Sequence, residues 1–259
     1  VEYLIDPTYQ RKFDLYDYTL KNVMSHLVSV RCPAEIPRDV SARVRAIARV
    51  AVKVLRLRDV ARIDFRLGHD GRIYFLEANA LPSLEPGSSI FAAAALNGLD
   101  YAAVVNAIVE SAARRYGVFL PEKRRPKKAQ VRVGFTFNLK RQRPTSESDD
   151  EEAEFDPPAT IEAVQKALED LGHIVVPLEA TPELPRRLID EAVDVVFNIA
   201  EGIGTGRGRE AQVPALCEMA GIPCTGSDAC ALAIALDKAL TKRILKQHDI
   251  PTPDFQIMH

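Results

Sequence analysis

The sequence has little net charge, no long apolar run and few cysteines. Its 34 basic and 36 acidic side chains give a formal net charge of −2, which offers no sign of a nucleic-acid partner. The longest apolar runs, such as residues 229–236, are too short to cross a membrane, and residues 1–6 lack the pattern of a signal peptide. We therefore expect a cytoplasmic protein with neither a membrane nor a nucleic-acid partner, and the oligomeric state stays open.

The cysteines give no metal or redox motif. None of the four is spaced as C-x-x-C, and the last three fall in or beside expected helices and a strand. We expect them to be buried free thiols. They are Cys32, Cys217, Cys224 and Cys230.

A polar, basic and Pro-containing stretch over residues 121–129 divides the chain. It is typical of an interdomain connector, and a solvated charge run is favoured over a nucleic-acid patch. The length of 259 residues, with 47% hydrophobic side chains, is enough for two domains. Because the chain begins with Val1 in the middle of an expected domain, we expect it to be a fragment.

An acidic hairpin over residues 61–79 is the most informative feature. Asp70-Gly71 between alternating strands favours a two-residue type I′ turn. That turn places Asp64 opposite Glu77, and Arg62 opposite Asn79, with all four polar groups on one side. The apolar side is then expected to comprise Ile63, Phe65, Leu67, Tyr74, Leu76 and Ala78.

Two carboxylates facing each other at about 5 Å between Cβ atoms repel unless a cation or proton lies between them. An amide oxygen two residues along completes a set of hard oxygen ligands, which suits Mg²⁺ carrying substrate phosphates. The alternative is a half-exposed hairpin with a charged outer face. Residues 87–89 then open an Ala-rich helix from about Ile90, whose free N–H groups and dipole favour an anion.

The second half alternates strands and helices. Apolar spacing predicts helices over 40–55 and 101–116 before the connector, and a third helix capped by Thr160 and ended by Gly172 after it. Strands are expected at 131–135, at 174–176 as a short buried strand, and at 194–198. This alternation predicts a parallel sheet covered on both faces, with a ligand at the carboxyl ends of its strands.

Two loops of this half have less defined roles. Glycines at alternate positions over 202–208 suit the approach of backbone to an anion, which is weak evidence alone. The acidic loop over 146–156 is expected to be a mobile surface excursion.

Residues 62–65 and 74–83 resemble the end of the ATP-grasp domain of D-alanine–D-alanine ligases and their relatives, which join a carboxylate to an amine. The resemblance implies that ATP is bound with Mg²⁺ or Mn²⁺, and that the metal ligands are Asp64, Glu77 and Asn79. It also implies that Arg62 and the backbone N–H of residue 83 stabilise the tetrahedral intermediate. Ser83 replaces the family's Gly, and would be strained if that position requires φ > 0.

Residues 16–21 are similar to the family's Tyr-Asp-Tyr-x-x-Lys, whose lysine touches the transferred phosphate. The resemblance therefore assigns Lys21 to the nucleotide. Pro33-Ala34 follows at a spacing that the family shares. The alternative for Lys21 is a solvated surface side chain.

A second resemblance is to the beginning of the same family, and it covers residues 195–198, 218–227, 236–242 and 249–253. The order is reversed, because a C-terminal segment precedes an N-terminal one, so we expect a tandem of two ligase units. The implied fold class is α/β, an ATP-grasp C-terminal lobe with an antiparallel sheet and helices followed by a Rossmann-like parallel-sheet domain. The expected domains are the C-terminal part of an ATP-grasp ligase domain (1–120), a linker (121–129), a Rossmann-like N-terminal domain of a second unit (130–228) and the start of a second ATP-grasp core (229–259).

The second unit departs from the family in its amino-acid pocket. Ala200-Glu201-Gly202 stands in place of Leu-His-Gly, residues 207–210 replace a Glu-Asp-Gly loop, and residues 137–140 replace Gly-Gly-x-Ser-x-Glu. Glu201 is expected to face a cationic group such as an amine, or else to bond loop N–H groups. Substrate contacts are expected from Ser88, Glu201 and Gly202. Lys238 is assigned to the nucleotide phosphates, with a helix-surface lysine as the alternative.

These observations predict an ATP-dependent carboxylate–amine ligase, related to peptidoglycan synthesis, that acts through an acyl phosphate on small amino-acid or peptide substrates. The competing hypothesis is a degenerate, non-catalytic module that binds nucleotide or supports its neighbour. Since neither part contains a complete ATP cleft, we expect the 259-residue chain to be inert by itself.

Overall fold

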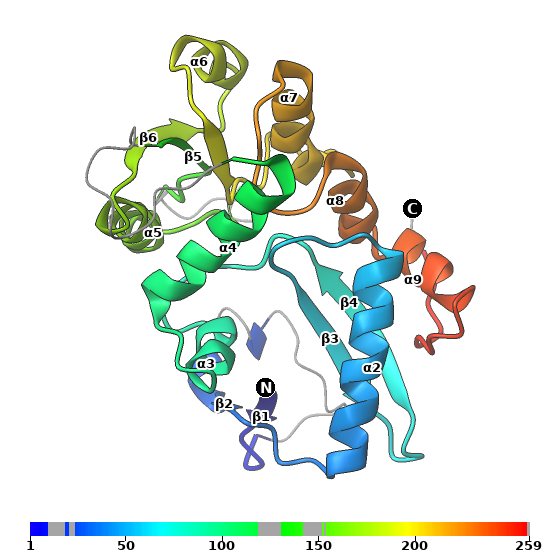
Figure 1. Ribbon diagram of the computed structural model, residues 1–259. Helices are drawn as coiled ribbons and strands as arrows, with labels where there is room; N and C mark the ends of the chain where they lie inside the picture. The colour runs from blue at the N-terminus through cyan, green and yellow to red at the C-terminus, as the bar shows by residue number, and fades with distance from the viewer. Residues whose placement is uncertain (10–18, 21–23, 119–130, 142–151, 153, 258–259) are drawn as a thin grey trace.

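The computed structural model describes residues 1–9, 19–20, 24–118, 131–141, 152 and 154–257 (Figure 1). The expected connector and Lys21 lie outside these residues. In its described residues, the part before the connector has two antiparallel two-stranded sheets and three α-helices, α2 to α4, that are each longer than one turn. In order they are β1 (Glu2–Ile5), η1 (Ser25–Leu27), β2 (Val28–Arg31), α2 (Arg38–Val54), β3 (Arg62–Leu67), β4 (Ile73–Asn79), α3 (Ser89–Ala95) and α4 (Tyr101–Tyr116).

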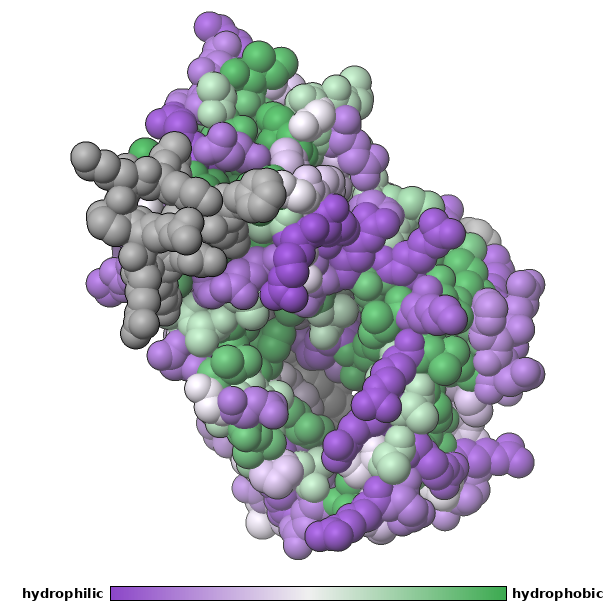
Figure 2. Space-filling view, in the orientation of Figure 1, coloured by the Kyte–Doolittle hydropathy of each residue, from purple (hydrophilic) through white to green (hydrophobic). Residues whose placement is uncertain are grey.

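The helix expected over 101–116 is confirmed at both ends. Asp100 accepts a hydrogen bond from the Ala103 N–H, and Gly117 adopts φ of 69° after the last residue. A carboxylate cap and a left-handed glycine are the signals that stop a helix at defined residues. α2 lacks such a side-chain cap and begins at Arg38, two residues before the expected start. Its exposed residues include Arg43, Arg45 and Arg49 as well as Val50 and Val52, and hydrophilic residues lie over this region in Figure 2.

The hairpin has the predicted facing pairs but a different turn. Asp64 lies opposite Glu77, and Arg62 opposite Asn79. The turn, however, has three residues, 69–71, because Gly68 pairs with Arg72 and Gly71 takes φ of 75°. A three-residue loop ending in a left-handed glycine is a common alternative to type I′. A β-bulge between Asp64 and Phe65 removes the one-residue difference.

The bulge changes which side chains of β4 are buried. Beyond it Ile73 and Phe75 are buried, at 2% and 0% exposure, whereas Tyr74 and Leu76 are not. The prediction that Tyr74 and Leu76 belong to the apolar face is therefore wrong, because one extra residue in β4 inverts the alternation. Leu67 shares the alternation of Ile63 and Phe65 along β3, and it is 42% exposed near the tip.

The part after the connector is a parallel three-stranded sheet with helices. The strand order is β6-β5-β7, and both pairings are parallel. The elements are β5 (Arg132–Phe137), α5 (Pro158–Asp170), β6 (Ile174–Glu179), α6 (Leu184–Asp190), β7 (Val195–Asn198), η2 (Arg209–Ala211), α7 (Gln212–Ala220), α8 (Ala229–Leu236) and α9 (Lys238–Lys246).

Helices cover both faces of this sheet, as expected. One hydrophobic cluster joins Phe135 and Phe197 to Leu168 of α5, and another joins Val196 to Leu188 of α6 and Cys217 of α7. Two local predictions are wrong. Thr160 does not cap α5, which begins at Pro158, and its hydroxyl has no partner among the described residues. β6 is a sheet edge rather than a fully buried strand, so Ile174 is 38% exposed.

The two parts share their cores. Val105 and Ile108 of α4 belong to the same buried cluster as Phe135 and Phe197 of the sheet. A second cluster joins Phe75 of the hairpin to α8 and α9, and the Phe75 N–H donates to the Pro251 carbonyl. In Figure 1, α4 lies between the hairpin and the parallel sheet. The two parts thus pack as one body at these contacts, while the expected domain boundaries stay a prediction.

The thiols are free, and two of them match the expectation. Cys217 and Cys224 are buried, but Cys32 is partly exposed and Cys230 is exposed, so the expectation is wrong for these two. Cys230 occupies the outer side of α8, where no packing is required of it. Within the described part of the chain, no helix has the length and apolar character needed to cross a bilayer.

Candidate functional site

Four polar side chains meet on one face of the hairpin. Arg62 Nε donates to Asp64 Oδ1 and Oδ2 at 3.0 and 3.2 Å, and Arg62 Nη2 donates to Glu77 Oε1 at 3.4 Å. Lys238 Nζ lies 2.6 Å from Glu77 Oε2. The two facing carboxylates are therefore balanced by two cationic side chains. One of these, Lys238, comes from the first turn of α9, on the other side of the connector.

The surroundings shift the pKa values of the two carboxylates, Asp64 and Glu77, in opposite directions. Burial raises the pKa of Asp64 above its ordinary value, although the Arg62 charge opposes it. Burial also acts to raise the pKa of Glu77, but the bond from Lys238 and the charges of Lys238 and Arg62 outweigh it, so that pKa is lowered. Glu77 is thus the stronger anion of the pair, and Asp64 depends more on a nearby cation to stay ionised.

The side-chain oxygen atoms of Asp64, Glu77 and Asn79 suit a hard cation. Two carboxylates and an amide are oxygen ligands of the kind Mg²⁺ prefers, and cationic groups already occupy the space around them. Asn79 Oδ1 accepts the Leu81 N–H at 2.9 Å, which orients this amide. In the described residues, the hairpin included, no group of three or more His, Cys, Asp or Glu side chains is arranged to hold a metal ion, since the hairpin offers two carboxylates.

Ser83 follows the hairpin in an unstrained conformation. It is absent from the residues with positive φ, so the strain that a glycine position would impose does not arise. Its Oγ accepts the Glu85 N–H at 3.2 Å, and its carbonyl accepts the Ser88 Oγ–H at 3.3 Å. Its own N–H has no acceptor among the described residues. Ser88 precedes α3, a helix of 7 residues, and is bonded to this loop.

A second group of acidic side chains lies at the carboxyl ends of the parallel strands. Burial, followed by the charges of Glu210 and Glu154, raises the pKa of Glu201 to about 9. Burial also raises the pKa of Glu210 to about 7. Arg209 Nη2 lies 3.8 Å from Glu201 Oε2 and pairs with Glu154. No backbone N–H in the described residues bonds the Glu201 carboxylate, so the alternative that it binds loop N–H groups has no support here.

Asp156 links this acidic group to the loop after the hairpin. Burial and the charge of Glu85 raise the pKa of Asp156 to about 7. Its N–H donates to the Asn138 carbonyl, and its carbonyl accepts the Lys140 N–H. The end of the acidic loop, Asp156, is therefore partly buried and hydrogen-bonded, whereas residues 146–151 and 153 of this loop lie outside the described residues. No sequence signal identified Glu154, Asp156 or Glu210 as neighbours of Glu201.

Gly202 has a structural reason to be glycine. It adopts φ of 89°, and a Cβ there would lie 2.2 Å from the Arg209 carbonyl oxygen. Asn138 bonds it twice, accepting the Gly202 N–H at 3.1 Å and donating to the Gly202 carbonyl at 3.2 Å. Asn138 belongs to the segment that replaces the family's early motif, so it supports the glycine loop. A substrate role for Gly202 stays a prediction.

Comparison with known proteins identifies the first part of the chain. The family model "D-ala D-ala ligase C-terminus" matches residues 5–110, a segment that includes the hairpin, Ser83 and most of α4. This segment belongs to the D-alanine–D-alanine ligase family. The assignment agrees with the resemblance carried by residues 62–65 and 74–83. The family model does not extend into the parallel-sheet part.

Curated D-alanine–D-alanine ligases are similar over a comparable length. Those of Moorella thermoacetica and Aquifex aeolicus are 45% and 43% identical over 93 and 97 residues, which are 36% and 38% of this chain. D-alanine–D-alanine ligase A of Brucella melitensis is 34% identical over 94 residues, or 36% of this chain. The matches span 29%, 32% and 27% of the three ligases, so the chain covers less than a third of each. No solved structure gave a significant match.

Proposed function

We propose that the chain is part of an ATP-dependent carboxylate–amine ligase that forms an acyl phosphate with Mg-ATP. The observation that carries the proposal is the facing pair Asp64 and Glu77, held with Arg62 and Lys238 within a segment of the ligase family. Such an enzyme activates a carboxylate by phosphoryl transfer and then joins it to an amine. It would act on small molecules in the cytoplasm.

The polar side chains of the hairpin have different proposed roles, which follow from their charge. Asp64, Glu77 and Asn79 would hold Mg²⁺, which neutralises the charge of the phosphates during transfer. Arg62 is always charged and presents a planar fork of donors, so it suits a developing oxyanion. The Ser83 N–H is a second donor for that oxyanion, since no other acceptor in the described residues takes it. Lys238 would leave Glu77 for a phosphate oxygen.

The parallel-sheet part supports a tandem origin. We infer that residues 130–228 derive from the N-terminal domain of a second ligase unit and residues 229–259 from the start of its ATP-grasp core. The strings quoted for the second resemblance, the parallel order β6-β5-β7 and the glycine loop at the end of β7 support this. The C-terminal segment of one ligase unit would then be followed along the chain by the N-terminal segment of the next.

The substrate class follows from the acidic group around Glu201. With Glu210, Glu154 and Asp156 nearby, an anionic substrate group would be repelled and an amine attracted. We propose a substrate that carries an additional amine, in place of D-alanine. Titration calorimetry of the chain with a diamino acid against alanine tests this. The proposal is wrong if the chain binds the diamino acid and alanine equally, or if Glu201→Gln weakens the binding of neither.

A chimera tests the ligase proposal. Residues 5–110 would replace the matched segment of the Moorella thermoacetica ligase, to which the chain is 45% identical over 93 residues. We expect D-alanine-dependent phosphate release, lost by about a hundredfold or more in Asp64→Asn and Glu77→Gln, because each removes an anionic ligand of the metal. The matched control is Asp70→Asn, at the exposed tip of the same hairpin. A folded chimera whose turnover survives Asp64→Asn and Glu77→Gln would refute the assignment.

A further inference from the structure

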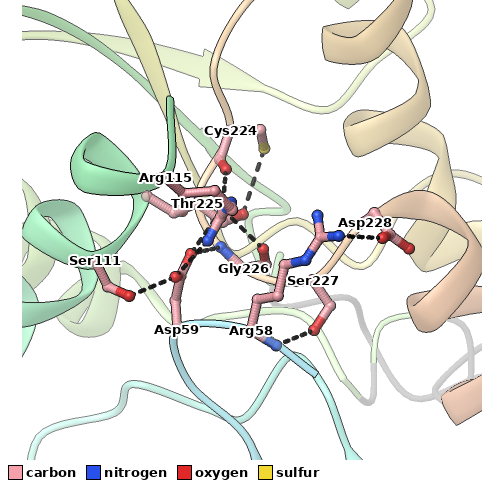
Figure 3. Close-up of polar contacts among 9 residues, drawn as sticks. All are labelled: Arg58, Asp59, Ser111, Arg115, Cys224, Thr225, Gly226, Ser227 and Asp228. Carbon is pink, nitrogen blue, oxygen red and sulfur yellow. Dashed lines mark hydrogen bonds and ion pairs between the residues drawn. The ribbon is translucent and has the colours of Figure 1, made fainter. Parts of the chain in front are cut away.

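A buried ion pair joins the two parts of the chain away from the hairpin carboxylates (Figure 3). Asp59 lies in the loop between α2 and β3, and its side chain is 1% exposed. Arg115, in the last turn of α4, donates Nη1 and Nη2 to the two Asp59 oxygens at 2.6 and 3.0 Å, and Ser111 Oγ donates at 2.7 Å. A carboxylate at this depth needs such partners, because its desolvation is costly.

The same ion pair holds a turn of the other part. Asp59 Oδ2 accepts the Gly226 N–H at 2.8 Å, and Arg115 Nη2 donates to the carbonyls of Cys224 and Gly226 at 3.0 and 3.3 Å. Beside it, the Arg58 N–H donates to Ser227 Oγ at 3.0 Å, and Arg58 Nη2 pairs with Asp228 at 3.0 Å. The main chain over residues 224–228 is thereby tied to the first part at several points.

That turn leads directly to Lys238. Asp228 caps α8 by accepting the Ala231 N–H, and Asp237 caps α9 by accepting the Leu240 N–H. α8 packs its Leu232 and Ala235 against the cluster that contains Phe75 of β4. A short helix held at its first residue and along one side can place the next helix with little freedom. Lys238, the first residue of α9, then meets Glu77 at 2.6 Å.

We propose that Asp59 and Arg115 are positioning residues that set Lys238 against Glu77 and so complete the hairpin site from the other part of the chain. The catalytic meaning of this geometry rests on the proposed function, but the geometry itself requires no turnover. The backbone of Asp59 supports the proposal, because it adopts φ of 59°, a conformation that L-residues other than Asn and Asp rarely take. Four hydrogen bonds to its side chain hold Asp59 in this left-handed conformation.

The test measures the chemical reactivity of the Lys238 amine in the whole chain. The chain is treated briefly with an acetylating reagent, and labelling of Lys238 is read by peptide mass spectrometry relative to Lys166, whose side chain is 76% exposed on α5. Glu77→Gln gives the labelling of an amine without its carboxylate, expected to be about twofold to fivefold above wild type for a half-exposed pair. Asp190→Asn, which breaks an exposed pair on α6, is the matched control.

We expect Asp59→Asn to raise Lys238 labelling to the Glu77→Gln level, and Asp190→Asn to leave it unchanged. Because Asp59→Asn can weaken the fold, Arg115→Lys is the second variant, which keeps a cation beside Asp59 but loses the donors to Cys224 and Gly226. Wild-type labelling in a folded Arg115→Lys or Asp59→Asn chain overturns the proposal. Failure of both variants to fold, judged by circular dichroism, also counts against it, since the pair would then be a general stabiliser. A chimera without ligase activity leaves this readout intact, so the two failures are distinguishable.

Discussion

At the scale of single residues, the surroundings give neighbouring carboxylates different pKa values. Asp64 and Glu77 face each other, yet the pKa of one is raised by burial and that of the other is lowered through Lys238 and Arg62. Around Glu201 no cation outweighs burial, so several acids have raised pKa values. The first pair is suited to a cation held between ionised groups, and the second group is suited to a proton or an amine.

The pH dependence of stability should reveal the Glu201 group. A carboxyl whose pKa is about 9 when folded and about 4.5 when unfolded binds more protons in the folded chain between these values. Stability should therefore fall as pH rises from about 4.5 towards 9. Glu201→Gln should flatten this decline and raise stability at pH 8 by about 1 kcal/mol or more. Thermal melting across this pH range measures both.

The control for this measurement is Glu162→Gln, on the exposed side of α5, which should follow the wild-type profile. If the stability of the Glu201→Gln chain declines with pH as steeply as that of wild type, ionisation of Glu201 does not destabilise the folded chain and the prediction is wrong.

At the scale of elements, the loop after β7 depends on two glycines for different reasons. Gly202 has both a positive φ and a carbonyl oxygen 2.2 Å from the place of a Cβ, whereas Gly204, with φ of 75°, has nothing within 4 Å. Gly204→Ala should cost about 1–2 kcal/mol, the strain of a left-handed alanine. Gly202→Ala should cost more, about 3 kcal/mol or above, because the main chain must also move. Urea denaturation of the two variants and wild type gives the difference, and equal losses would contradict the packing argument.

Local sequence signals predicted some element boundaries and not others. Apolar spacing predicted α4 over 101–116, which Asp100 and Gly117 bound in the structure, but the expected Thr160 cap of α5 was wrong. The hairpin shows the limit of such signals, since Asp70-Gly71 suits either a two- or a three-residue turn. The facing pairs Asp64–Glu77 and Arg62–Asn79 were nevertheless predicted, because the bulge cancels the difference in turn length. The buried face of β4 was not predicted, because the extra residue of the bulge inverts the alternation of its side chains.

At the scale of the whole molecule, contacts between distant segments could not be predicted from the sequence. Lys238 was assigned to a phosphate site, but nothing local to it or to Glu77 reports their distance. Asp59 and Arg115 carry no motif, and their importance becomes visible only when α4 and the 224–228 turn are adjacent. Side-chain periodicity identifies a buried face without identifying its partner, so the cores shared across the connector were equally hidden.

The bulge beside Asp64 also has a consequence for how this hairpin tolerates change. Pairing on the site side of the bulge is offset by one residue from pairing on the tip side, so Leu76 has no partner across the ladder. A family member that loses one tip residue could recover a regular ladder by losing this extra residue too, leaving the metal-facing pairs untouched. Lengths at the tip and at the bulge can therefore drift together through insertions and deletions while the chemistry at the other end of the strands is inherited unchanged.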